Sequence, residues 1–259
     1  MDISKFFNPD EKPLDNLVPD GGFCGIFRTI GCIGDSLSSG ELESLSDENI
    51  VGWHDYYEYS WGQYMARDIG SKVYNFSKGG MTARTFIESF GDKCGVWETP
   101  CQAYILALGV NDIGGWTTET LGDVSDIGMK ANTNFTNSYT NIIIRLKRLQ
   151  PKAKFFLMTI PRDVREAEDS LADQHAEIIR EIANRYKNCY VLDFRKYAPV
   201  YDEEFRKHFF LAGHMNPMGY MLTARMVESY IDYIIRHNTD DFKQVGFIGT
   251  PYHNINEPW

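Results

Sequence analysis

Five short apolar runs, separated by segments with helical periodicity, constrain the fold of this chain more than any other feature. The runs cover residues 28–33, 72–76, 103–108, 154–160 and 190–194. Each is short enough to be a strand that is buried on both faces. Strands that alternate with helices in this way predict a parallel sheet covered by helices on both sides.

The segments between and after these runs carry the periodicity of amphipathic helices. We expect helices over residues 61–69, 134–149, 171–186 and 217–236. Pro151 follows the second of these as a stop signal. Asn216 and Pro217 are well placed as the N-cap and the first residue of the last helix.

The charge balance excludes some classes of function. The chain has 259 residues, with 26 basic against 36 acidic side chains and a formal net charge of −10. Broad binding to nucleic acid or to an anionic membrane surface needs clustered Lys and Arg, so we expect neither. No apolar run reaches the roughly 18–20 residues of a membrane span. The start of the chain also lacks the apolar region of a secretory signal.

The cysteines and the absence of a linker complete the general prediction. Five cysteines without a CxxC pair are typical of free thiols in a reducing compartment, and we expect a cytoplasmic protein. No segment rich in Pro, Gly and Ser divides the chain. We therefore expect one domain over residues 1–259, with a core at about 28–237, an N-terminal arm at 1–27 and a C-terminal tail at 238–259.

The loops that follow the predicted strands carry the chemistry, because parallel sheets bind ligands at the carboxyl ends of their strands. Ser36 follows the first strand in a Gly-Asp-Ser turn, and a glycine pair that ends at Gly80 follows the second. Asn111 follows the third strand, and His214 precedes the last helix. Each signal alone is more typical of an ordinary turn or a solvated histidine. Together and in this order they have a chance level on the order of one in ten thousand or lower.

These four segments resemble the four sequence blocks of the SGNH-hydrolase superfamily, also called GDSL esterases and lipases. The matching segments are residues 34–37, 75–82, 109–112 and 213–217, and the resemblance covers roughly residues 28–237. It implies an α/β fold, a flavodoxin-like three-layer α/β/α sandwich with a five-stranded parallel sheet. The five strands expected from the apolar runs agree with that implication.

The resemblance also implies roles for individual residues. Ser36 is the nucleophile and His214 is the base that takes its proton. The backbone N–H groups of Ser36 and Gly80 and the side-chain amide of Asn111 form the oxyanion hole. No metal ion or cofactor takes part. The implied function is that of a carboxylic ester hydrolase acting on a small-molecule ester.

One departure concerns the group that orients the histidine. The family usually has Asp three residues before the histidine, and here that residue is Leu211. In a first interpretation a backbone carbonyl, such as that of Leu211, accepts the His214 Nδ1–H in a Ser-His dyad. In a second, a carboxylate elsewhere substitutes; the candidates are Asp193, Asp202, Glu203 and Glu204. In a third, catalysis is weak or lost, and the chain is a carbohydrate- or ligand-binding relative.

Two long loops predict walls around the site. Residues 40–60 include Trp53, and residues 113–129 include Trp116. Long loops after strands often form lids, and aromatic rings can stack on a sugar or line an acyl pocket. We therefore expect a small acylated carbohydrate or another short-chain ester as substrate. The aromatic tail is expected to pack on the body or on a partner subunit, which leaves a homo-oligomer open.

Overall fold

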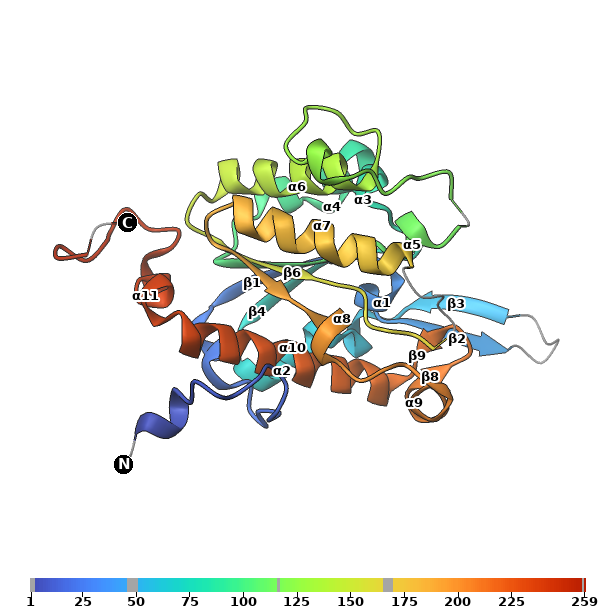
Figure 1. Ribbon diagram of the computed structural model, residues 1–259, viewed down its shortest axis with the longest axis horizontal. Helices are drawn as coiled ribbons and strands as arrows, with labels where there is room; N and C mark the ends of the chain where they lie inside the picture. The colour runs from blue at the N-terminus through green and yellow to red at the C-terminus, as the bar shows by residue number, and fades with distance from the viewer. Residues whose placement is uncertain (1–2, 46–50, 116, 165–169, 258) are drawn as a thin grey trace.

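Five parallel strands lie at the centre of the molecule in the order β4-β1-β5-β6-β7 (Figure 1). The computed structural model describes residues 3–45, 51–115, 117–164, 170–257 and 259. The strands are β1 Thr29–Gly34, β4 Lys72–Ser77, β5 Ala103–Ala107, β6 Lys154–Met158 and β7 Cys189–Leu192. The predicted parallel sheet is confirmed, and each strand lies within two residues of its expected bounds.

Helices cover both faces of the sheet and complete the predicted three-layer α/β fold. On one face pack α6 Phe135–Leu149 and α7 Leu171–Arg185, and on the other α2 Trp61–Ile69 and α10 Pro217–His237 (Figure 1). Two hydrophobic cores fill the spaces between the sheet and these layers. The capping signal before α10 is confirmed, since the Asn216 side chain accepts the Gly219 N–H at 2.9 Å and Pro217 begins the helix.

The order of the strands places the site. The chain leaves β1 for β4 on one side and then crosses to β5 on the other side, so the order reverses at β1. A crevice at such a switch point is where ligands bind in open parallel sheets. Gly34, the last residue of β1, pairs with Ser77 on β4 and Ala107 on β5. The three loops that follow these strands therefore start at the same edge.

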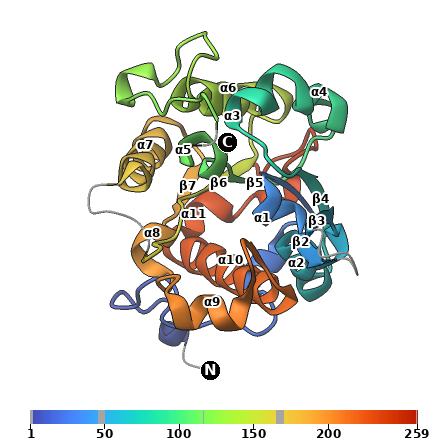
Figure 2. The same ribbon diagram turned by 90° about the vertical axis from the view of Figure 1, so that its right-hand side faces the viewer.

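Two small hairpins beside this edge were not expected from the sequence. β2 Glu41–Leu45 pairs antiparallel with β3 Val51–Asp55, and β8 Phe210–Leu211 pairs with β9 His214–Met215. Figure 2 views the molecule from the end at which they project, with α9 Glu203–Phe209 beside them. The segment expected to be a lid-like loop is thus largely a hairpin in its described residues.

The remaining elements are short. They are α1 Ser36–Ser39, α3 Ala83–Thr85, α4 Gly91–Cys94, α5 Val110–Ile113, α8 Phe194–Tyr197 and α11 Thr239–Phe242. Single turns of 3-10 helix cover Ile3–Phe6, Gly22–Ile26, Tyr57–Tyr59, Val96–Glu98, Val124–Asp126 and Val245–Phe247, and a π-helical turn covers Phe86–Phe90. Several of them directly follow a strand and turn the chain at the sheet edge.

Both ends of the chain contact the body. In the N-terminal arm, Glu11 pairs with Arg236 of α10 at 2.6 Å. In the tail, Phe242 is buried and its ring packs against Phe27 and Phe156. Phe242 therefore packs on the body, whereas Tyr252 and Ile255 farther along the tail are exposed, and packing on a partner subunit stays a prediction. The single-domain boundaries stay a prediction. Among the helices that the structure describes, none combines the length and apolar character that crossing a membrane requires.

Candidate active site

The turn after β1 presents Ser36 at the first position of α1. Asp35 is the N-cap residue, and its carboxylate accepts the Leu37 N–H at 3.0 Å. The first N–H groups of a helix have no acceptor within the helix, so the Ser36 N–H is available to an incoming group. Ser36 is 9% exposed. The turn therefore supplies a hydroxyl and a backbone donor at one point of the sheet edge.

The glycine turn after β4 lies against the loop after β5. Met81 N–H closes the turn on the Lys78 carbonyl at 3.3 Å, and Gly80 has φ 71°, a conformation that favours glycine. Within the described residues, no protein acceptor takes the Gly80 N–H. The Asn111 side chain donates to the Met81 carbonyl at 3.0 Å. The two segments implied to form the oxyanion hole are thus tied together at the edge where Ser36 lies.

A buried histidine supports the turn that carries Asn111. His175 Nε2 lies 3.2 Å from the Leu108 carbonyl, and its ring packs against Gly109, which has φ 136°. Burial lowers the pKa of His175 to about 4, so its ring is neutral at physiological pH. Because a carbonyl only accepts hydrogen bonds, Nε2 carries the proton. A side chain larger than glycine at position 109 would displace this ring.

His214, the first residue of β9, lies between two carboxylates. Its Nδ1 is 2.5 Å from Oε1 of Glu43, and its Nε2 is 3.1 Å from Oε1 of Glu41. The two glutamates are two residues apart on β2, so their side chains point to the same face of the hairpin. Glu43 Oε1 also accepts the Gly213 N–H at 3.1 Å. Glu43 therefore holds both the histidine ring and the backbone before it.

Glu41 connects the hairpin to the turn that carries Ser36. The Tyr220 hydroxyl donates to the Glu41 backbone carbonyl at 2.6 Å and lies 3.5 Å from the Ser36 carbonyl. The Glu41 carboxylate also lies against Gly79, where a Cβ atom would collide with it. Burial raises the pKa of Glu41, and the attraction of His214 offsets part of that rise. A buried carboxylate thus meets the nitrogen that a serine hydroxyl would need.

The carboxylates named from the sequence as the orienting acid lie elsewhere. Asp193 pairs with Arg180 at 2.9 Å, Asp202 caps α9, and Glu204 contacts His208 at 2.8 Å. Glu203 is in the first turn of α9. None of these four carboxylates contacts His214, whose ring nitrogens face Glu43 and Glu41. The interpretation with a Leu211 carbonyl is also corrected, because His214 Nδ1 faces a side-chain carboxylate that a neighbouring hairpin supplies.

The sequence contains a signal for the position of the Glu43 carboxylate. Glu41 and Glu43 lie two residues apart directly after the Ser36 turn. In a strand, which has a two-residue period, this spacing places both glutamates on one face. The segment was expected to be a loop, where the spacing has no such consequence. Which way the face points depends on the pairing of β2 with β3 and on β9, and no local pattern predicts that contact.

Two further buried carboxyls flank the site. Burial raises the pKa of Asp35 to about 7 and that of Asp112 to about 7. The Asp112 carboxyl accepts the Ala83 N–H at 3.0 Å, as Asp35 accepts that of Leu37. Both residues therefore tie down loop backbone around the candidate oxyanion hole.

The two aromatic residues expected in the substrate pocket differ in placement. Trp53 on β3 pairs directly with Glu43 on β2 and is 63% exposed. Paired residues of an antiparallel hairpin share one face, so the indole lies beside the carboxylate that holds His214. Trp116 lies outside the described residues. In the part of the chain that is described, no group of three His, Cys, Asp or Glu side chains is arranged to hold a metal ion.

Comparison with solved structures identifies the fold. A family 2 carbohydrate esterase with a carbohydrate-binding domain from Corynascus thermopiles (Myceliophthora fergusii) superposes with a TM-score of 0.58 at 15% identity, over 80% of this chain and 66% of that one. A family two carbohydrate esterase from Clostridium thermocellum in complex with cellohexaose gives 0.57 at 16%, over 87% and 66%. The acetyl xylan esterase AlAXEase gives 0.55 at 19%, over 78% and 99%.

The sequence itself identifies the family. No curated protein sequence matches the chain. Residues 32–222, which are well over half of the chain, match the GDSL-like Lipase/Acylhydrolase family. That range begins in β1 and ends in α10, and it includes the nucleophile turn, the glycine turn, the Asn111 loop and the His214 hairpin. The chain therefore belongs to the GDSL-like lipase/acylhydrolase family.

Proposed function

We propose that this protein is a serine esterase that hydrolyses short-chain acyl esters with a Ser36-His214-Glu43 triad. The observation that carries the proposal is the 2.5 Å contact between His214 Nδ1 and Glu43 Oε1. A carboxylate at this nitrogen fixes the tautomer in which Nε2 can accept a proton, and it stabilises the imidazolium that then forms. Glu43 thus supplies the function of the acid that Leu211 replaces.

The chemistry proceeds in two steps of acyl transfer. His214 Nε2 takes the Ser36 proton while Ser36 Oγ attacks the ester carbonyl carbon. The Ser36 and Gly80 N–H groups and the Asn111 amide stabilise the oxyanion. The intermediate collapses as His214 gives its proton to the leaving alkoxide, which leaves an acyl-serine. A water molecule then repeats the sequence and releases the carboxylic acid.

Glu41 competes with Ser36 in this scheme. Its carboxylate meets His214 Nε2 at 3.1 Å, so it must turn away before that nitrogen can accept the serine proton. The raised pKa of Glu41 favours this, because protonation removes the charge that attracts it to His214. The contact therefore describes a resting arrangement, and the substrate displaces Glu41 when it enters.

The alcohol part of the substrate is proposed to be a carbohydrate. Trp53 is exposed beside Glu43, where a flat aromatic surface can stack on a sugar ring. Two of the structural neighbours are carbohydrate esterases, which agrees with this choice. The alternative is a carbohydrate-binding relative without catalysis. It was based on Leu211, and the carboxylate of Glu43 at His214 removes most of that support.

Covalent labelling tests the proposal. A fluorophosphonate should modify the wild-type protein at the peptide that contains Ser36, and the modification should disappear in Ser36→Ala and weaken in His214→Ala. Ser44→Ala, a substitution on the exposed part of the hairpin, is the matched control and should label normally. Absence of labelling in the wild type, or full labelling of Ser36→Ala, would overturn the proposed esterase function.

A further inference from the structure

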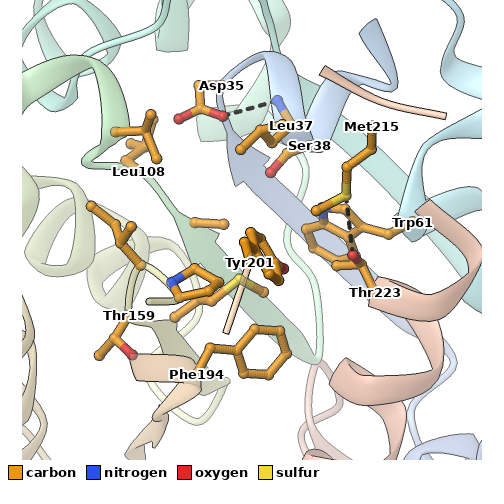
Figure 3. A pocket seen from close by; sticks show the side chains of 15 residues that line it. Asp35, Leu37, Ser38, Trp61, Leu108, Thr159, Phe194, Tyr201, Met215 and Thr223 are labelled. Carbon is orange, nitrogen blue, oxygen red and sulfur yellow. Dashed lines mark hydrogen bonds between the residues drawn. The ribbon is translucent and has the colours of Figure 1, made fainter. Parts of the chain in front are cut away.

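A mostly apolar cavity lies at the carboxyl edge of the sheet and has no assigned role. Its volume is about 60 Å³. Met158, Phe194 and Tyr201 form its buried interior, while Ile160 and Pro161 are half-buried at its rim. In Figure 3 the turn with Asp35, Leu37 and Ser38 lies on one side of the space and Phe194 on the opposite side. Such concave, largely apolar spaces are typical of ligand sites.

Neighbours of the candidate catalytic residues line the cavity. Leu37 directly follows Ser36, and Val110 directly precedes Asn111; both line the cavity and both are half-buried. An ester carbonyl between the Ser36 hydroxyl and the Asn111 amide would therefore lie close to two residues that line the cavity.

The walls of the cavity are mostly hydrocarbon. Within the described residues, Asp35 Oδ2 and Ser38 Oγ have no hydrogen-bond partner, and both atoms are buried. The Thr159 hydroxyl donates to the Asp193 carboxylate at 3.2 Å, and the Thr223 hydroxyl donates to the Gly219 carbonyl at 2.9 Å. The cavity thus offers little polar surface to a charged or hydroxylated ligand.

We infer that this cavity is the acyl pocket and that it selects acyl chains of about four carbons over acetyl. The inference rests on the proposed esterase function. A water-sized group needs roughly 15 Å³ of such a volume, so about four groups fit, and the three carbons of a butyryl group beyond its carbonyl come close to that number. An acetyl methyl would leave most of the space empty, whereas a butyryl chain would fill it. An eight-carbon chain would exceed it.

The chain-length profile of the wild type is the first test. Burial of one CH₂ group contributes about 0.8 kcal/mol, so two extra methylenes should raise kcat/KM for p-nitrophenyl butyrate over the acetate by roughly 15-fold. The octanoate should fall below the butyrate. Equal rates for acetate and butyrate, or a maximum at octanoate, would overturn the assignment. No hydrolysis of any ester would instead reject the proposed function.

Substitutions in the cavity make the test specific. Ala107→Leu fills the space and should reverse the preference toward acetate. Ile160→Ala enlarges the rim and should move the optimum to a longer chain. Ser44→Ala, on the exposed part of the hairpin, is the control and should leave the butyrate-to-acetate ratio unchanged. If Ala107→Leu keeps the wild-type Tm and the wild-type ratio, the cavity is not the acyl pocket.

A binding measurement separates the pocket from catalysis. In Ser36→Ala with ¹³C-labelled methionine methyl groups, sodium butyrate should shift the Met158 and Met215 signals, because both side chains line the cavity. Sodium acetate at the same concentration should shift them far less. Shifts of equal size with the two salts, or no shift with butyrate, would contradict the inference whatever the ester assays give.

Discussion

The carboxyl edge of the sheet and the β2–β3 hairpin contribute to the same site by different means. At the edge, Ser36 and Asn111 are buried, and paired strands and backbone hydrogen bonds place them. The hairpin reaches His214 only through the side chains of Glu41 and Glu43. The comparison teaches that the proposed nucleophile and oxyanion donors lie on loops of the central sheet, whereas the proposed acid comes from a hairpin outside that sheet.

The largest loss of activity is expected from a substitution at the carboxyl edge of the sheet. Ser36→Ala removes the nucleophile, and kcat for a short-chain ester should fall by about 10⁴- to 10⁶-fold with little change in Tm. Steady-state kinetics with p-nitrophenyl butyrate measures the loss. A fall of less than 100-fold would mean that the edge does not carry the nucleophile.

The second-largest loss of activity is expected from a substitution in the β2–β3 hairpin. Glu43→Gln keeps the shape of the side chain and an oxygen for the Gly213 N–H, but it removes the negative charge at His214. We expect kcat to fall by about 10²- to 10⁴-fold, as for loss of the acid in a serine protease triad. Glu204→Gln on α9 is the matched control. Similar activities for the two variants would assign the orienting role to another group.

The oxyanion donor at the edge should have a smaller effect. Asn111→Ala removes one donor to the developing charge and should lower kcat by about 10²- to 10³-fold. Because the amide also donates to the Met81 carbonyl, KM and Tm are measured in parallel. A rise in KM with kcat unchanged would place Asn111 in substrate binding and not in transition-state stabilisation.

The buried carboxyl at the edge should control stability as a function of pH. The pKa of Asp35 rises from an ordinary 3.8 to about 7 in the folded protein because the group is buried. Between about pH 4 and pH 7 the unfolded chain loses this proton while the folded protein keeps it, so the free energy of unfolding decreases as the pH rises. The decrease is at most about 4 kcal/mol.

Asp35→Asn keeps an acceptor for the Leu37 N–H and should flatten this dependence, as measured by urea unfolding at a series of pH values. The pKa of Asp112 is raised to about 7 for the same reason, so the double variant with Asp112→Asn should flatten it further. A wild-type stability that increases from pH 4 to pH 7, with the same slope in Asp35→Asn, would contradict the expected direction.

The smallest effect is expected at Glu41. If its carboxylate competes with Ser36 for His214 Nε2, Glu41→Ala should raise kcat/KM at pH 7 by roughly five- to tenfold, the equivalent of one hydrogen bond. The measurement uses the same butyrate assay. A loss of activity beyond tenfold would make Glu41 a participant in the reaction and would extend the role of the hairpin.

The same comparison explains what the sequence could predict. The sheet, its main helices and the family followed from local patterns, because apolar runs and capping residues act within a few positions of one another. Ser36, Gly80 and Asn111 lie in such patterns, and the structure brings their three loops to one edge. Their roles stay predictions until the variants are measured.

The contact of Glu43 with His214 spans 171 residues and depends on how two hairpins pack. The carboxylates expected from the sequence were Asp202, Glu203 and Glu204, which lie near His214 along the chain, and Asp193, which lies at the end of a predicted strand. Proximity along the chain failed because α9 turns these side chains elsewhere and Arg180 binds Asp193.

The contact between Glu43 and His214 can be observed directly by proton NMR. The Nδ1–H of His214 should give a resonance at unusually low field, because this proton is shared with a carboxylate. Our account predicts that Glu43→Gln abolishes this signal or moves it to higher field, and that Asp202→Asn and Glu204→Gln leave it in place. A low-field resonance that persists unchanged in Glu43→Gln would contradict the central claim.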